Sequence, residues 1–312
     1  MRRYIAIRLL HSVVTIFGVS VVVFLLLHLI PGDPVQMMLG EYIDKETYMM
    51  IYKKLGLDQP IHIQYFMFLS RVLHGDLGES YISGARVLEM MIERIPATLE
   101  LGIAGMIIAI AIAVPAGIIS ATKQYSIFDY FSMTASLIGV SIPSFWQGIA
   151  LMLLFSLTLG WLPSSGIGTP PDIKHLILPA ITLGTGMAAS TARLVRSSML
   201  EVLSQDYITT ARAKGLREIV VIHKHALKNA LIPVVTNLGN QIGHLIGGAV
   251  VVETVFAWPG VGRLVYTSIT NRDFPVIQGC ILLVATSVVF VNLLVDISYA
   301  YLNPKIRYRK SR

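Results

Sequence analysis

Long apolar segments alternate with shorter polar connections along this chain. Six stretches have about 20 or more mainly apolar residues, the length that crosses a hydrocarbon core of roughly 30 Å as a helix. They run over Leu9–Ile30, Leu99–Ser120, Phe131–Leu157, Leu176–Met199, Ala230–Val252 and Val276–Ala300. Backbone polar groups inside a bilayer must be paired within the protein, so we predict an all-α, polytopic membrane protein with about six transmembrane helices.

The composition agrees with a protein whose main solvent is lipid. Hydrophobic residues make up 54% of the chain and charged residues 14%, which leaves too little polar surface for a soluble protein of this size. Arg2, Arg3 and Arg8 precede the first apolar stretch as in a signal peptide, but that stretch is too long for one. We therefore interpret it as an uncleaved first span. The single cysteine, Cys280, is expected to be a small core residue.

Basic residues are distributed unevenly between the two sides of the predicted bundle. With a cytoplasmic amino terminus, sixteen of the 25 Lys and Arg residues lie inside, where short loops are normally the more basic ones. This predicts that both termini are cytoplasmic, and it explains the net charge of +7 without nucleic-acid binding. The expected organisation is a cytoplasmic start (1–8), a first span (9–30), an extracytoplasmic region (31–98), a five-helix core (99–300) with a cytoplasmic loop (200–229), and a basic tail (301–312).

The predicted spans contain few groups that could carry ions or perform chemistry. Ionisable residues lie near span ends, as at Arg193, Arg196, Glu253 and Asp296, where snorkelling or an aqueous surface accommodates them. His28 and His244 are lone histidines, for which a hydrogen-bonded structural role is favoured over a proton relay. No hydrolase, metalloprotease or phosphate-loop motif occurs, so we expect no catalytic residue, metal site or cofactor in this chain. An ion- or proton-coupled carrier remains the alternative from another class.

Two features of the spans concern packing. Gly239, Gly243 and Gly247 recur every four residues and are expected to form a helix-packing or subunit-interface face, with a moving gate as the alternative. Proline removes a helix hydrogen bond and crowds the preceding turn. We therefore expect kinks or breaks at Pro115, Pro143 and Pro179.

The longest cytoplasmic connection, Leu200 to Asn229, has helix signals of its own. Asp206 is a candidate N-terminal cap and Gly215 a candidate stop, which predicts a short helix of about eight residues. A second amphipathic stretch follows, with Leu216, Ile219, Val220, His223 and Leu227 near helical spacing. Such a segment can dock into a partner's groove, and the alternative is a helix lying on the inner membrane surface.

The residues of this loop resemble those of a known transporter family. Asp206-Tyr-Ile-Thr-Thr-Ala-Arg-Ala-Lys-Gly215-Leu216, followed by His225-Ala-Leu-Lys-Asn-Ala-Leu-Ile-Pro233, resembles the EAA loop of binding-protein-dependent ABC importer permeases. Further motifs look like the dipeptide and oligopeptide branch: Pro31-Gly-Asp-Pro34, Leu55-Gly-Leu-Asp58, His74-Gly-Asp-Leu-Gly78, Arg196-Ser-Ser-Met-Leu-Glu201 and Trp258-Pro-Gly260. Thr209 and Thr210 depart from the general pattern, which has Glu and Ala there, and Pro233 lies about five residues late.

The resemblance implies a type I ABC importer permease, a non-catalytic pore subunit in a bacterial or archaeal inner membrane. It implies four partner subunits: a second, homologous permease that forms a heterodimer, two cytosolic ATPases that bind ATP and Mg, and an extracytoplasmic solute-binding protein. The implied cargo is a dipeptide or oligopeptide, with nickel or another metal chelate as the alternative. The residues implied to couple to the ATPases are Asp206, Tyr207, Ala211, Arg212, Lys214, Gly215 and Leu216.

Overall fold

A computed structural model describes residues 2–29, 35–36 and 44–302 of the chain. Within its helices, the side chains of residues 2–4, 26–27, 244–248, 296 and 298–302 lie outside this description. The chain forms two compact units. Unit 1 contains Leu99–Trp258 and the described residues from Val291 onward, and unit 2 contains Arg2–Thr98 and Pro259–Phe290. The predicted five-helix core begins at the same boundary, but Pro259–Phe290 groups with the N-terminal residues instead.

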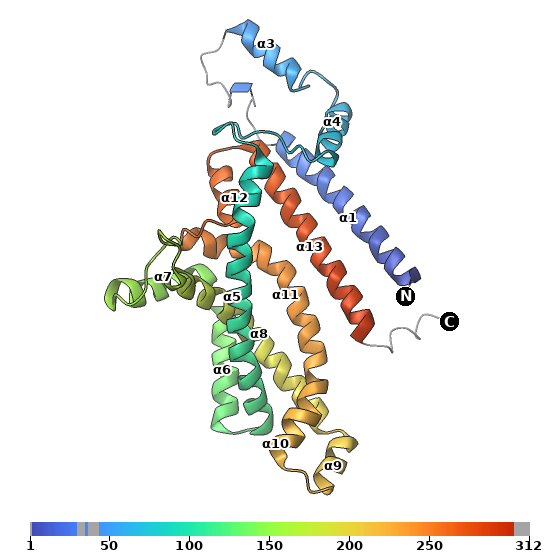
Figure 1. Cartoon of the computed structure of the whole chain (residues 1–312), viewed down its shortest axis with the longest axis vertical. Coiled ribbons are helices and arrows are strands. Elements are labelled where there is room, and N and C mark those ends of the chain that lie inside the picture. Colours follow the sequence, from blue (N-terminus) through green and yellow to red (C-terminus); the bar gives the residue numbers. More distant parts are fainter. Residues whose placement is uncertain (1, 30–34, 37–43, 303–312) are drawn as a thin grey trace. The chain divides into compact units, whose positions relative to one another are not determined.

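The described residues form helices joined by short connections, which confirms the all-α prediction (Figure 1). Along the chain these helices begin with α1 (Arg2–Leu29), α3 (Lys45–Lys54), α4 (Ile61–Leu73), α5 (Val87–Thr122), α6 (Ile127–Ser141) and α7 (Ser144–Met152), which continues into the π-helical segment η1 (Leu153–Thr158). They are followed by α8 (Ile173–Leu203), α9 (Asp206–Ala213), α10 (Glu218–Val220), the π-helical segment η2 (Val221–Ala226), α11 (Leu227–Val255), α12 (Val261–Thr270) and α13 (Phe274–Leu302).

Each predicted span coincides with helical structure, but the number of membrane-length apolar helices is smaller than six. Among the described residues, α1, α5 and α13 are long and apolar enough to cross a membrane, and a bent helix pair makes up to a fourth span. The other two predicted spans, α8 and α11, are long helices that carry glycine, hydroxyl and amide groups, such as Thr182, Ser190 and Gln241. These groups lower the hydropathy of α8 and α11, and their crossing of the membrane stays a prediction.

The predicted proline break occurs at Pro143. The third predicted span is not one straight helix, because α6 ends at Ser141 and the helix that starts at Ser144 is bent from it by 102°. Ile142 and Pro143 have extended backbone, and Pro143 caps α7 with its fixed φ of −61°. Helices α5 and α8 both continue through their prolines, Pro115 and Pro179.

In unit 1, α5 and α8 approach each other closely through small residues. On α5, Gly105, Ala109, Ala113 and Gly117 recur every four residues, and on α8 the same spacing joins Gly184, Ala188 and Ala192. A Cβ atom at Gly184 would lie 2.6 Å from the backbone oxygen of Gly105, and one at Gly117 would lie 2.5 Å from Cβ of Val195. Small residues promote helix association in lipid because they let backbones meet. We call this contact the small-residue seam.

The predicted glycine face on α11 is only partly described. A Cβ at Gly239 would lie 2.7 Å from Cγ2 of Val295 on α13, so this glycine does allow close helix packing. Gly243 is buried, and Gly247 lies where the structure describes no side chains. Subunit contact by this face stays a prediction.

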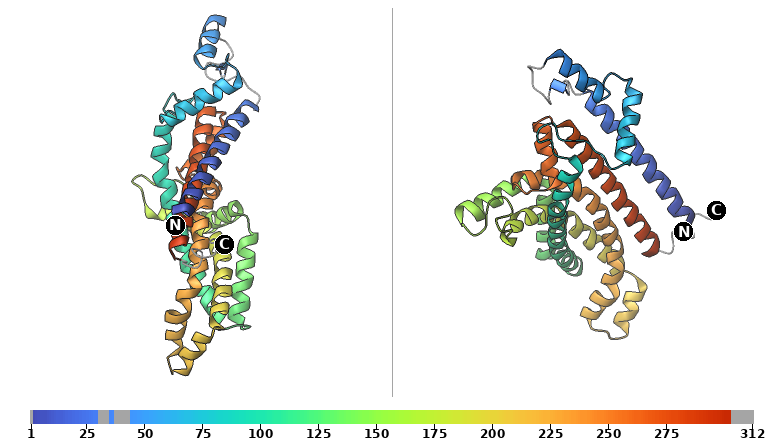
Figure 2. Two further views of the ribbon diagram at one scale, coloured as in Figure 1. Left: turned by 90° about the vertical axis from the view of Figure 1, so that its right-hand side faces the viewer. Right: turned by 45° about the horizontal axis from the view of Figure 1, so that its top comes forward.

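Unit 2 is built on two clusters of buried side chains. One joins α5, α12 and α13 through Met91, Leu264 and Cys280, which confirms the core position of the cysteine. The other joins α1, α4 and α13 through Phe24, Phe68 and Leu282. The amphipathic stretch Ile61–Leu73 forms α4, which lies beside α1 (Figures 1 and 2).

We expect Gly184→Ala to destabilise the protein, because its Cβ would press on the backbone of α5 and force the seam apart. Overpacking of this kind costs about 1–3 kcal/mol. The matched control is Gly186→Ala on the same helix, where a Cβ meets nothing within 4 Å. Thermal unfolding of the purified protein in detergent should show a lowered transition for Gly184→Ala only. Equal transitions for the two variants would contradict the seam.

Candidate functional site

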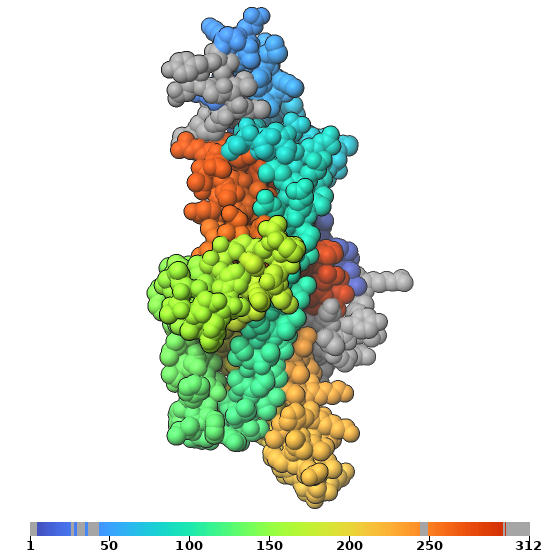
Figure 3. Space-filling view, turned by 60° about the vertical axis from the view of Figure 1, so that its left-hand side comes forward, coloured from blue at the N-terminus to red at the C-terminus, as the bar shows by residue number. Residues whose placement is uncertain are grey.

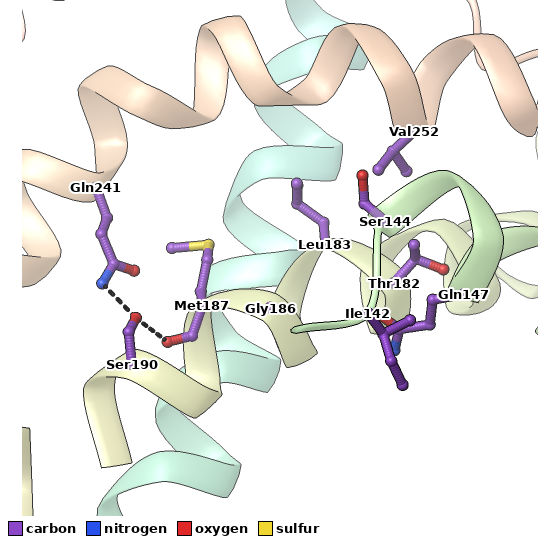
Figure 4. Close-up of a pocket in the computed structure, with 10 residues that line it drawn as sticks. All are labelled: Ile142, Ser144, Gln147, Thr182, Leu183, Gly186, Met187, Ser190, Gln241 and Val252. Carbon is purple, nitrogen blue, oxygen red and sulfur yellow. Dashed lines mark hydrogen bonds between the residues drawn. The ribbon is translucent and has the colours of Figure 1, made fainter. Parts of the chain in front are cut away.

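A cavity in unit 1 lies where the broken helix faces α8 and α11. Its volume is ≈320 Å³, and Figure 4 shows its lining. The lining residues are Ile142, Ser144, Gln147, Thr182, Leu183, Gly186, Met187, Ser190, Gln241 and Val252. None of these ten side chains is ionisable, and five carry a hydroxyl or amide group. The cavity therefore presents uncharged hydrogen-bonding groups among apolar ones.

The break at Pro143 brings its own polar groups to this cavity. Non-helical backbone is tolerated at membrane depth where it lines a cavity or is buried in protein, and Ile142 and Ser144 line this one. Gln147, one turn into α7, donates from Nε2 to Oγ1 of Thr185 on α8 at 2.6 Å. The amide thus ties the start of α7 to α8.

Gln241 extends from α11 toward α8 across the cavity (Figure 4). Its Nε2 donates to Oγ of Ser190 at 3.4 Å and to Oγ1 of Thr191 at 3.3 Å. Its Oε1 is buried and has no hydrogen-bond partner among the described residues. A buried acceptor without a donor costs about 1–3 kcal/mol, so a ligand or water that donates a hydrogen bond would be favoured beside it.

The loop between α8 and α11 contains the predicted short helix. Helix α9 has eight residues, and Gly215 adopts a left-handed φ of +74° just beyond it, which confirms the predicted length and stop. Gln205, not Asp206, occupies the N-cap position, and Asp206 lies in the first turn. Its charge there still suits the positive end of the helix dipole. Figure 3 shows the segment with α9, α10 and η2 in gold, projecting beyond the rest of unit 1.

The inner side of α9 belongs to a buried cluster that includes residues of α8 and α11, two of the helices that line the cavity. Ile208 and Ala211 are buried in one cluster with Met199 of α8 and Ala230 of α11. Ala211, one of the predicted coupling residues, thus lies on the buried side of α9, and its coupling role stays a prediction. Tyr207 is 43% exposed, and its hydroxyl accepts a hydrogen bond from Nδ2 of Asn229 at 2.8 Å.

The outer side of the loop combines apolar and charged groups. Leu216 is 40% exposed and Ile219 is 64% exposed. Arg212 pairs with Glu218, at 2.7 Å from Nη2 to Oε1, and Lys214 is exposed at the end of α9. The hydrogen bond from Arg212 lowers the pKa of Glu218, so the pair persists at neutral pH and is lost only as the pH falls through that lowered pKa.

The second amphipathic stretch has one exposed and one buried side. Leu216, Ile219 and His223 are exposed, and Val221 and Ala226 are buried. The π-helical segment η2 turns the residues after Val221 away from a 3.6-residue period. The exposed apolar residues are accessible to a partner, and docking of a partner there stays a prediction.

An ion pair joins three helices of unit 1. Arg196 of α8 donates from Nε to Oδ1 of Asp129 on α6 at 2.7 Å and from Nη2 to Oδ2 at 2.8 Å. Ser120 of α5 donates its hydroxyl to the same carboxylate. Asp129 is 3% exposed. We call these three residues the interhelical clasp.

The clasp and the cavity were missed by sequence reasoning. Arg196 and Glu253 were expected at span ends, where snorkelling or an aqueous surface accommodates them, but Arg196 is paired and Glu253 is fully buried. The available signal was Asp129 itself, an acid close to the start of an apolar stretch, without a basic residue one turn away. His28 bonds to the Phe24 backbone oxygen and to Gln64, which confirms its structural role, while the His244 side chain lies outside the described residues.

Comparison with known sequences places this geometry in context. The family described as "Binding-protein-dependent transport system inner membrane component" matches residues 113–308, and its N-terminal counterpart matches residues 1–102. A dipeptide transport system permease protein, DppB of Alkalihalophilus pseudofirmus, is 46% identical over 96% of this chain and 98% of its own length. The di/tripeptide permease DppB of Pseudomonas aeruginosa and the glutathione permease GsiC of Salmonella paratyphi A are each 45% identical, over 99% of this chain and 100% of their own.

A solved structure has a similar fold. The MetNI methionine ABC transporter in an inward-facing conformation matches with a TM-score of 0.57 over 69% of this chain and 96% of the matched chain. The two sequences are 20% identical, so the likeness concerns the fold alone.

We expect Asp129→Ala to destabilise the protein, because it leaves the Arg196 guanidinium largely buried without its partner. The expected loss is about 3 kcal/mol. Replacing both partners, as in Asp129→Leu with Arg196→Met, should recover most of it, because no unpaired charge remains. Arg193→Met on the same helix serves as the control, since no ion pair joins it to the described residues. Thermal unfolding measures all four proteins, and a double variant no better than the single one would argue against the clasp.

Proposed function

We propose that this chain, which belongs to the binding-protein-dependent transport system inner membrane components, carries di- and oligopeptides as one half of the pore of an ATP-driven importer. Members of this family are non-catalytic, multi-pass membrane permeases that work with ATP-hydrolysing subunits and a binding protein. The chain is such a permease. Peptide as the cargo is the proposal, and the observation that carries it is near-full-length similarity to permeases named for a dipeptide, a di/tripeptide and glutathione.

The cavity chemistry supports a peptide more than a metal ion. A peptide is rich in amide N–H and C=O groups, and Gln147, Ser190 and Gln241 can exchange hydrogen bonds with them without selecting one side chain. A nickel ion would favour imidazole, thiolate or carboxylate ligands, and none of the ten lining residues carries one. The relatives described above are likewise peptide permeases, so nickel is the weaker alternative.

The packing of the loop supports coupling to an ATPase. Helix α9 is seated on α8 and α11, and both of these helices line the cavity. A force applied to the exposed side of α9, around Tyr207 and Leu216, would therefore reach the cavity through two packed helices. The proposed cycle is alternating access: closure of the ATPases moves α9 and opens the cavity outward, and hydrolysis resets it.

The remaining partners and the orientation belong to the same proposal. A second, different permease would complete the pore, and two cytosolic subunits would bind ATP and Mg, so this chain needs no cofactor. Both termini would lie in the cytoplasm of a bacterial or archaeal cell, which puts α3 and α4 on the outer side with the binding protein. The uneven distribution of basic residues supports this orientation.

Uptake by the assembled importer tests the cargo and the energy source together. Proteoliposomes containing the complete importer should accumulate a labelled dipeptide when ATP is supplied inside with the ATPases, also after ionophores have collapsed all ion gradients. An ion- or proton-coupled carrier would lose uptake with the gradients. ATP-dependent uptake of nickel without peptide uptake would overturn the peptide assignment.

Gly215→Val should lower ATP-coupled uptake by about tenfold or more, because a β-branched residue is strained at a φ of +74° and the end of α9 would be displaced. Space is not the cause, since a Cβ there meets nothing within 4 Å. Gly215→Asn is the matched control, because asparagine tolerates the left-handed region. ATPase activity and peptide uptake are measured side by side, and the coupling role of α9 is wrong if the valine variant transports normally with intact membrane insertion.

A further inference from the structure

A second and larger cavity lies within unit 2 and is lined by other residues than the first. Its volume is ≈920 Å³, near the upper end of the range of roughly 300–1,000 Å³ typical of small-molecule sites. Helices α1, α3, α4 and α13 contribute to its wall, together with the loop before α5. If the amino terminus is cytoplasmic, the carboxyl end of α1 that borders this cavity is extracytoplasmic.

The wall of this cavity combines aromatic surface with charges of both signs. Tyr52, Phe68 and Tyr81 supply aromatic rings. Arg71 lies on α4, and Asp76 and Glu79 follow in the loop after it. A wall of this kind suits a small zwitterion with variable apolar side groups.

The charged groups are available to a ligand. Arg71 has no ion-pair partner among the described residues. The pKa of Tyr81 is raised, chiefly by burial, and the nearby Arg71 charge acts against this rise. Glu79 makes a backbone bridge to Arg86, which holds the loop while its carboxylate remains unpaired among these residues. Oδ1 of Asp76 accepts from the Gly78 N–H at 2.9 Å and is thus partly engaged.

We propose that the unit 2 cavity is a receiving site for the free ends of a short peptide, with Arg71 binding the α-carboxylate and Glu79 the α-ammonium group. The guanidinium fork matches a carboxylate in a bidentate manner, and every unmodified peptide has the same two charged ends. Recognition by the ends would leave the side chains to the aromatic wall, where sequence matters little. This inference rests on the proposed peptide cargo, and it adds a binding site within the permease itself.

The test measures binding of a labelled alanine dipeptide to the assembled permeases and ATPases in nanodiscs, with the solute-binding protein left out. Arg71→Gln should weaken binding of the free dipeptide about tenfold. The natural protein should bind the C-amidated dipeptide about tenfold more weakly than the free dipeptide, because amidation removes the carboxylate. The Arg71→Gln variant should bind the C-amidated dipeptide as tightly as the natural protein does, because that ligand has no carboxylate to lose contact with. The same two results are expected for the α-ammonium group. Glu79→Gln should weaken binding of the free dipeptide, and it should not further weaken binding of the N-acetylated dipeptide.

Arg86→Gln is the matched control, because Arg86 belongs to the same region, its side chain is 75% exposed and it does not line the cavity. The proposal is overturned if the dipeptide does not bind, if blocking its ends changes nothing, or if Arg71→Gln behaves like Arg86→Gln. It is also overturned if Arg71→Gln weakens only the binding of the solute-binding protein, since Arg71 would then serve docking. Failure of the proposed function is separate: the natural importer would then not accumulate peptide at all.

Discussion

The close approach of α5 and α8 is the contact on which unit 1 depends. Glycine and alanine at four-residue intervals on both helices let their backbones meet, and a Cβ atom at Gly184 or Gly117 would not fit. Because α8 is held in this way, three features along it have fixed positions. Thr182 and Ser190 face the cavity, Arg196 reaches α6, and Met199 packs in one cluster with the loop between α8 and α11.

Polar groups in unit 1 are used where the helices need orientation as well as attraction. Apolar side chains gain little from leaving lipid for one another, so interhelical hydrogen bonds and close packing carry more of the specificity. The amide of Gln147 joins α7 to α8, and the clasp joins α5, α6 and α8 through Asp129. Along the chain, one contact lies before the break at Pro143 and the other lies after it. The irregular backbone at the cavity is therefore held on both sides by contacts to α8.

The loop between α8 and α11 and the cavity involve the same two helices. The buried face of α9 meets α8 and α11 close to the ends that emerge into the loop, and the same two helices reach the cavity farther along. Tyr207 bonds to Asn229 and thereby ties α9 to the start of α11. The exposed side of the loop includes the apolar residues Leu216 and Ile219.

The sequence alone predicted the helical class, the apolar segments, helix α4 and the length of α9 with its stop at Gly215. These features depend on the length of apolar runs, on amphipathic periodicity and on the ability of glycine to adopt a left-handed conformation, and all three act within a few residues. Tertiary structure decided which small-residue face forms the close contact with α8, which acid pairs with Arg196, and which side of η2 is buried. The sequence pointed to the glycines of α11 as a packing face because the spacing of small residues along one helix is visible in the sequence. Which other helix packs against that face is not visible there. Asp129 and Arg196 are distant in the chain, and a π-helical turn changes the register without a signal in the hydrophobic pattern. Contacts of this kind exist only when distant segments are brought together.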